Sequence, residues 1–318
     1  MSSTITTAEV ATTPRKHPES KVKTPQSKVR TKSWHGLAFT SPAILLLTIF
    51  FFVPVILCFV LAFTNARLIS PEPAKFTGLD NFHRLFSDPL FWKSLRNTLY
   101  FAVVVVPVQS ALALLLALLV NGQGRGKNFF RTVYFVPVVT SIVVVSILWR
   151  FMYAPDGLVN NLLQAVSFNV VQGTDWLSNP STAMPAIIFM SIWQAVGFHM
   201  VIWLSGLQTI PGEQYEAAAI DGANAWQRFR YVTWPGLRDT RTFILVTITI
   251  SAFSLFAQIN VMTNGGPLDS TSTVVFQAVR TGYSQQQTGY ASAISLFFFA
   301  LVLTVSLVQR YLTRDKDL

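Results

Sequence analysis

The sequence has little charge and almost no cysteine. Only 12% of its 318 residues are Asp, Glu, Lys or Arg, whereas a soluble domain carries about 25%. Cys58 is the single cysteine, so an internal disulfide and a metal site built from several cysteines are excluded. Hydrophobic residues make up 51% of the chain, including 26 Phe. This composition indicates an integral membrane protein.

Signatures of enzyme chemistry are also missing. The segment Gly122–Lys127 looks like a phosphate-binding loop, but it lacks the G-x-x-x-x-G-K-[ST] spacing, because residues 121 and 128 are both Asn. We find no Ser/His/Asp set or carboxylate pair that would form a catalytic pocket. The formal charge of +10 indicates cytoplasmic anchoring of a membrane chain rather than nucleic-acid binding. We therefore expect no catalytic residue, no metal site and no nucleotide site in this chain.

Residues 1–32 are rich in Ser, Thr, Pro and Lys and have almost no large apolar side chains. Such a segment cannot bury a core, so we expect a disordered, basic cytoplasmic tail. The apolar run after Lys32 is too long for a signal peptide. We interpret it as a first span that the mature protein keeps.

Six apolar runs follow, each long enough for a membrane-spanning helix of about 20 residues. They lie near residues 38–64, 95–120, 131–153, 183–207, 236–262 and 288–311. The predicted fold class is therefore all-α, a polytopic membrane protein with six transmembrane helices. In this division, residues 33–94 hold the first span and an extracytoplasmic loop, residues 95–311 the other five spans, and residues 312–318 a cytoplasmic tail.

Lys and Arg residues in the loops predict the orientation of the spans. The N-terminal tail, loop 121–131, loop 208–235 and the C-terminal end are basic. Loop 154–182 contains Asp156 and Asp175 but neither Lys nor Arg. We therefore expect both termini and loop 208–235 in the cytoplasm, and loop 154–182 on the other side of the membrane.

The polar loop 208–235 predicts two short helices joined by a sharp turn. Pro211 suits a first helical position, and Gly222 suits the left-handed position that ends a helix. Asn224 and Gln227 have the spacing of a capping box at the start of a second helix. A polar helical hairpin between two spans, with small residues on one side, suits docking against a second protein.

Pro235 closes this stretch. The residue before a proline is disfavoured in a helix, so we expect a break at residue 234 and a new helix start at Pro235.

These residues resemble the EAA loop of ABC importer permeases, through Glu216-Ala217-Ala218, Gly222 and Pro235. In that family the loop forms a coupling helix in a cleft of the ATP-hydrolysing subunit. Asp221 and Phe229 are similar to the carbohydrate branch of the family, the maltose and glycerol-3-phosphate type. The resemblance implies coupling to an ATPase through Glu216, Ala217, Ala218, Asp221, Gly222, Phe229 and Pro235. The family often has a second proline where this chain has Asp239, so the next helix is expected to start differently.

Shorter motifs extend the resemblance over most of the chain after residue 40. They are Phe76–Phe82 (F-x-G-L-x-N-[YF]), Asn97–Leu99 (N-T-L), Arg131 with Pro137 and Trp149, Gly157–Asn160, Thr263–Pro267 (T-x-G-G-P) and Gly289–Ala293. Each is short, and their joint order and spacing carry the resemblance. The turn at 265–267 is similar to the first of the two permeases in a sugar operon.

The resemblance implies a permease subunit that works by alternating access and is not itself an enzyme. Its expected partners are a second permease in a heterodimer, two ATPase subunits that bind ATP and Mg, an extracytoplasmic substrate-binding protein, a sugar and the lipid bilayer. No cofactor of its own is expected. Within the branch, the chain looks most like the trehalose importer permeases of mycobacterial type, so a disaccharide such as trehalose is favoured.

Polar side chains inside the fourth and fifth spans are candidates for the substrate pathway, because buried polar groups in a membrane are costly. Amide, imidazole and indole groups match the hydroxyl groups and C–H face of a sugar. The candidates are Trp193, Gln194, His199, Gln258, Asn260 and Asn264. Ser251, Ser254 and Gln258 are predicted to share one helical face, and Gly197 is expected to allow a local break. The alternative, that these residues only join span to span, stays open, and for His199 it is favoured.

Three rival functions are weighed against this one. A glycerol-3-phosphate permease would favour Arg or Lys near the pathway, and the interiors of the fourth and fifth spans contain neither. An ion-coupled secondary transporter would place carboxylates at mid-membrane, and the spans have none well inside. A channel or a purely structural membrane protein would leave the EAA-like loop unexplained.

Overall fold

The computed structural model describes residues 33–122, 126–167 and 173–313. The chain divides into two compact units, Met1–Phe51 and Phe52–Leu318. The predicted disordered tail 1–32 and most of the predicted C-terminal tail lie outside the described residues.

The smaller unit contains helix α1 (Ser33–Leu47), which continues into a π-helical turn at Thr48–Phe52. Its large apolar side chains from Phe39 onward are exposed, which suits a helix that is apolar all round and surrounded by lipid. With the following α2 (Val53–Leu61), this run forms a candidate span over Phe39–Leu61. The first span is therefore found close to its predicted bounds, 38–64.

The described part of the larger unit consists of helices and the loops that join them, and its one β contact is an isolated bridge between Thr64 and Phe76. After α2 its helices are α3 (Asp80–Ser87), α4 (Pro89–Val120), α5 (Lys127–Val139), α6 (Ile142–Met152), α7 (Leu158–Val166), α8 (Ala183–Gln208), α9 (Gly212–Ile220), α10 (Ala225–Arg228), α11 (Trp234–Gly236), α12 (Arg238–Phe253), α13 (Ala257–Met262), α14 (Val274–Val279) and α15 (Thr288–Thr313). π-helical turns occupy Phe229–Thr233 and Arg280–Ser284. The all-α prediction is confirmed.

The third predicted span, 131–153, is not one continuous helix. In the described residues, five helical runs are long and apolar enough to cross a membrane, and α5 with α6 makes a sixth only as a pair bent by 97°. Pro137 lies in the last turn of α5, and the backbone leaves the helical conformation at Thr140 and Ser141, where ψ is 139° and 131°. The missing N–H of Pro137 weakens the helix at the point where the chain turns.

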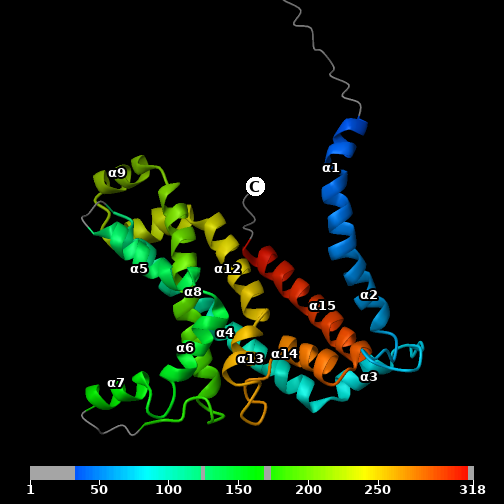
Figure 1. Ribbon diagram of the computed structural model, residues 1–318. Coiled ribbons are helices and arrows are strands. Elements are labelled where there is room, and N and C mark those ends of the chain that lie inside the picture. Colours follow the sequence, from blue (N-terminus) through cyan, green and yellow to red (C-terminus); the bar gives the residue numbers. More distant parts are fainter. Residues whose placement is uncertain (1–32, 123–125, 168–172, 314–318) are drawn as a thin grey trace, which may run out of the picture. The chain divides into compact units, whose positions relative to one another are not determined.

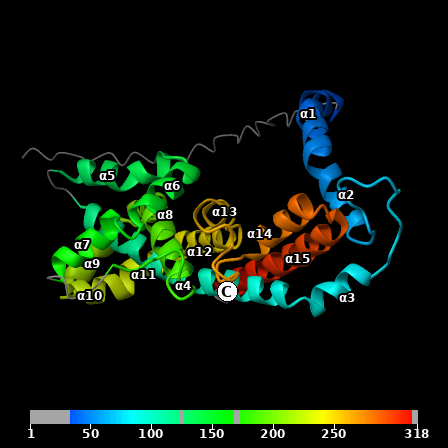
Figure 2. The ribbon, with the colours of Figure 1, turned by 60° about the horizontal axis from the view of Figure 1, so that its bottom comes forward.

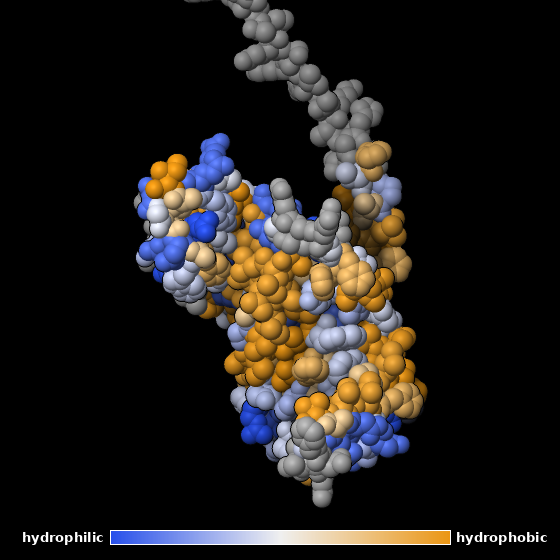
Figure 3. Space-filling view, turned by 90° about the vertical axis from the view of Figure 1, so that its left-hand side faces the viewer, coloured by the Kyte–Doolittle hydropathy of each residue, from blue (hydrophilic) through white to orange (hydrophobic). Residues whose placement is uncertain are grey.

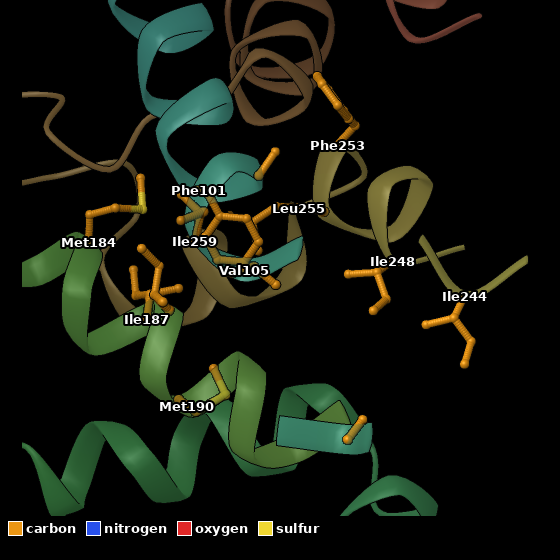
Figure 4. Close-up of a cluster of buried hydrophobic side chains, with 14 of the residues drawn as sticks. Phe101, Val105, Met184, Ile187, Met190, Ile244, Ile248, Phe253, Leu255 and Ile259 are labelled. Atoms are coloured by element: carbon orange, nitrogen blue, oxygen red, sulfur yellow. The ribbon is translucent and has the colours of Figure 1, made fainter. Parts of the chain in front are cut away.

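The helices α4 and α8 form the centre of the larger unit, and α5, α12 and α13 pack around them (Figure 1). Figure 4 shows Phe101 and Val105 of α4 in one buried cluster with Ile187 of α8 and Ile259 of α13. On the other side of α12, the helices α14 and α15 lie against each other in both views (Figures 1 and 2).

Gly197 lies where α8 crosses α5. A Cβ atom on Gly197 would stand 1.9 Å from the backbone oxygen of Tyr134, so only glycine lets the two helices come this close. α8 is continuous through this position. The prediction of a local break at Gly197 is therefore wrong, because the glycine serves helix packing.

Asparagines of the shorter motifs tie loops to helix ends. Asn81 donates from Nδ2 to the backbone oxygens of Ala62 (2.9 Å) and Thr64 (2.8 Å). Asn97 donates from Nδ2 to the backbone oxygens of Asp269 and Ser272, both at 3.0 Å. Because amides satisfy backbone groups that the membrane would leave unpaired, these motif positions have a structural role.

One face of the larger unit carries a broad hydrophobic band between two polar ends (Figure 3). Exposed apolar side chains on the long helices include Val103 (70%), Leu119 (64%) and Phe299 (64%). Exposure on this scale would cause a soluble protein to associate. It suits lipid or another membrane subunit as the surroundings.

Candidate functional site: a docking loop and a polar cavity

The docking loop, residues 208–235, begins with a short helix that ends as the sequence predicts. Gly222 has φ +74°, and its N–H donates to Ala219 O at 3.1 Å while Ala223 N–H donates to Ala218 O at 2.9 Å. This pair of bonds is the Schellman arrangement, which satisfies the last carbonyls of α9. At the other end, Pro211 precedes the helix as its N-cap and is not its first residue, which corrects the predicted start by one position.

The second half of the loop also forms as predicted, up to Pro235. Asn224 and Gln227 make a full capping box, with bonds of 2.8 and 2.9 Å. The predicted break at residue 234 is wrong, because Trp234 is helical with φ −64° and ψ −44°. The turn before it is widened, with Trp234 N–H bonded to Phe229 O five residues back. Because of this π-helical turn, the chain remains helical up to Pro235.

The coupling candidates lie on or near the surface of this loop. Glu216, Ala217, Asp221, Gly222 and Pro235 are exposed, whereas Ala218 and Phe229 are half-buried.

Three large apolar side chains that the sequence analysis did not single out are also exposed on this loop. Ile220 is 87%, Trp226 69% and Tyr231 75% exposed. Trp226 stacks on Phe229 with ring centroids 5.7 Å apart. Large apolar groups held out from a capped helical hairpin fit the central contacts of a protein interface.

The polar cavity has a volume of about 260 Å³ and lies between α4, α8, α12 and α13. Its polar lining residues are Gln109, Ser191, Gln194, His199, Ser251 and Gln258, and none of its lining residues carries a formal charge. Gln109 Nε2 lies 2.8 Å from His199 Nδ1, which is also 3.1 Å from Ala195 O. His199 Nε2 and Ser191 Oγ are buried and have no hydrogen-bond partner among the described residues.

The structure brings three of the pathway candidates, Gln194, His199 and Gln258, to this cavity. Gln194 and His199 do not share a helical face by spacing, and both still line the cavity. Ser254 lines a different, mostly apolar cavity between α14 and α15. The predicted common face with Ser251 and Gln258 fails there, because α12 ends at Phe253 and helix resumes only at Ala257.

The other three candidates lie outside the polar cavity. Trp193 packs against Trp149, with ring centroids 5.4 Å apart. Asn260 and Asn264 are exposed, and Asn264 has φ 50° in the turn that follows α13.

Gln109 and Ser191 are site residues that the sequence analysis missed. Both are polar, buried and inside apolar helices, which is the signal that selected Gln194 and Gln258. Applying it to the second span as well would have found Gln109. Elsewhere in the described chain, no cluster of three or more His, Cys, Asp or Glu side chains is placed to hold a metal ion.

Long apolar helices, an uncharged cavity among them and an exposed helical hairpin that leads into a cavity-lining helix define a membrane transport component. The chain belongs to the family of binding-protein-dependent transport system inner membrane components, whose model matches residues 109–317. It is accordingly a multi-pass inner membrane permease of the ABC transporter class, and a transport component rather than an enzyme.

Individual relatives cover nearly the whole chain. The chain is 35% identical over 286 residues to the lactose transport system permease protein LacF of Rhizobium radiobacter, covering 89% of this chain and 95% of that one. It is 33% identical to the diacetylchitobiose uptake system permease protein NgcF of Streptomyces coelicolor, covering 96% and 92%. A crystal structure of a bacterial ABC transporter that imports the acidic polysaccharide alginate contains a chain that matches with a TM-score of 0.76, 25% identity and coverage of 89% and 96%.

Proposed function

We propose that the chain forms half of the transmembrane pathway of an ABC importer for a neutral sugar, with a disaccharide such as trehalose favoured. Relatives named for lactose transport and for diacetylchitobiose uptake support a sugar. A cavity with amide, hydroxyl and imidazole groups and no charged lining residue supports a neutral solute.

Both termini and the docking loop are proposed to face the cytoplasm, where two ATPase subunits would bind ATP and Mg. A second permease would complete the pathway as a heterodimer, and an extracytoplasmic binding protein would deliver the sugar. The description of the family as binding-protein-dependent supports that last partner.

One observation carries the coupling proposal: the docking loop connects α8 to α12, and both α8 and α12 line the polar cavity. Tyr215 OH and Thr233 Oγ1, 3.0 Å apart, tie the two halves of the loop together. Movement of the loop with the ATPase would therefore move two walls of the cavity. A difference in contacts between two states is what lets ATP binding change access to a solute site.

The rival substrates and mechanisms have less support. Glycerol 3-phosphate would need a cation to pair with its phosphate, and no Lys or Arg lines the polar cavity. An ion-coupled secondary transporter would place a carboxylate there, and no Asp or Glu lines it either.

The proposal is tested with the complete importer in vesicles, by measuring ATP-dependent uptake of radiolabelled trehalose. Unlabelled trehalose and lactose serve as competing sugars, and glycerol 3-phosphate as the charged competitor. We expect uptake that sugars inhibit and glycerol 3-phosphate does not. Uptake driven by a proton gradient without ATP, or inhibited only by glycerol 3-phosphate, would contradict the proposal.

A further inference from the structure

A third hollow, the basic groove, has a volume of about 520 Å³ and lies away from the polar cavity. Three segments distant in sequence form it: the start of α4, the residues Pro180–Pro185 around the start of α8, and the turn after α13. Its rim includes Lys93, Arg96 and Tyr100 of α4 and Leu268 of the turn. Lys93 and Arg96 are three residues apart on one helix, so they share a face.

The groove carries positive charge that no lining carboxylate balances. Arg96 is exposed and makes no hydrogen bond or ion pair with a described residue. Lys93 donates from Nζ to the backbone oxygen of Leu268, which leaves its charge uncompensated. Asp269 adjoins the rim, but its carboxylate lies 3.7 Å from Arg280. The groove therefore suits an anionic group.

Leu268 stands at the edge of the groove with 78% of its surface exposed. Its φ of 49° is uncommon for a residue with a side chain. The turn is fixed by Asn97 Nδ2, which donates to Asp269 O (3.0 Å), and by Thr271 Oγ1, which donates to Gly266 O (2.7 Å). A strained residue held in place by its surroundings is typical of a functional surface. The turn thus presents an apolar side chain beside two cations in a fixed position.

Pro180 and Ser181 of the groove belong to loop 154–182, which the charge pattern assigns to the extracytoplasmic side, and Lys93 belongs to residues 33–94, which hold the predicted extracytoplasmic loop. Figure 1 shows the turn after α13 at the end of the larger unit opposite α9. The groove shares no lining residue with the polar cavity, so the two are separate sites. The partner expected on this side is a protein, because the family depends on a binding protein.

We propose that the basic groove is a docking site for the extracytoplasmic binding protein. An Asp or Glu side chain of that protein binds at Lys93 and Arg96, and an apolar pocket beside it receives Leu268. Exposed charge pairs at a rim steer association and set register, while a buried apolar anchor contributes to affinity. This inference rests on the proposed function, which supplies the partner and the orientation.

The test uses the complete importer in lipid nanodiscs and its own binding protein, defined as the soluble protein whose deletion abolishes uptake. The readout is the binding-protein concentration that gives half-maximal stimulation of ATP hydrolysis in the presence of trehalose. For Arg96→Glu we expect that concentration to rise about tenfold, and for Leu268→Asn about threefold, with basal hydrolysis unchanged. Asn is chosen because it tolerates a left-handed backbone.

Arg67→Glu is the matched control, since Arg67 is exposed in the first extracytoplasmic loop and does not line the groove. It should shift the half-maximal concentration less than twofold. An Asp- or Glu-to-Arg change on the binding protein that restores stimulation of Arg96→Glu would identify the opposing carboxylate.

Two results would overturn the docking site. One is an unchanged half-maximal concentration in Arg96→Glu. The other is a defect seen only when the nanodiscs contain phosphatidylglycerol and absent in pure phosphatidylcholine, which would assign the groove to a lipid headgroup. A wild-type importer that the binding protein does not stimulate would instead overturn the proposed function, and with it the partner assigned to the groove.

Discussion

The docking loop and the polar cavity are held together by contacts of very different range. In the loop, the Schellman bonds and the capping box join residues three to five positions apart. In the cavity, the contact between Gln109 and His199 joins residues 90 positions apart, on α4 and α8. The loop is therefore a local structure that a few side chains specify, whereas the cavity exists only when the bundle is assembled. Substitutions in the loop should therefore affect coupling to the ATPase, whereas substitutions in the bundle should affect stability or the KM for sugar.

The largest effect is expected in the loop. Gly222→Asp places a side chain at φ +74°, which costs about 1 kcal/mol, and adds a negative charge beside Asp221. Transport should fall close to zero while the spans still insert, because insertion depends on the apolar helices. Uptake and co-purification of the ATPase measure the two aspects: loss of the ATPase identifies a dock, and retained ATP hydrolysis without uptake identifies a transmitter.

Gly212→Ala is the control for this variant, since a Cβ meets nothing within 4 Å at either glycine but only Gly222 of the two has a positive φ. It should transport normally. Normal uptake by Gly222→Asp would show that the loop does not couple transport to the ATPase.

A smaller effect, of a different kind, is expected where the bundle is tightest. In Gly197→Ala the new Cβ would approach the backbone oxygen of Tyr134, which cannot rotate away. α5 and α8 must then separate, at a cost of about 1–3 kcal/mol, and thermal unfolding in detergent should occur at lower temperature. In Gly206→Ala the nearest atoms belong to the side chain of Thr240, so a milder loss is expected. Equal melting temperatures for the two variants would argue against close helix packing at Gly197.

The smallest effect is expected from a comparison of a residue that lines the polar cavity with one that does not. Gln258→Ala removes an amide from the polar cavity, and loss of one hydrogen bond to a solute costs about 1 kcal/mol. The KM for sugar uptake should rise roughly fivefold, with assembly and basal ATP hydrolysis unchanged. Asn260→Ala, on the exposed side of α13, tests whether that residue belongs to the pathway as the sequence analysis expected. If both variants keep the wild-type KM, neither amide binds the solute.

Much of the docking loop followed from the sequence alone, because its geometry depends on residue type and short spacing. Gly222 predicts the left-handed stop, and the spacing of Asn224 and Gln227 predicts the new cap. Pro235 was misjudged, because the residues before it form a widened π-helical turn, which the general restriction on the residue before a proline does not anticipate. Composition likewise sufficed for the fold class, because lipid accepts few architectures other than long apolar helices.

The positions of the spans were determined by the apolar runs, but their continuity and their neighbours were decided only in the folded chain. The sequence contains Pro137 and Gly197, but it does not show that α5 and α6 meet at a bend of 97°. Nor does it show that α8 packs against α5 with Gly197 next to the backbone of Tyr134. Gln109 had no visible partner until α4 and α8 packed together. Lys93 and Leu268 likewise met only when the turn after α13 folded onto the start of α4. Local hydrogen bonding and the membrane as solvent fix what each segment is, whereas side-chain packing between distant segments decides which polar groups share a cavity.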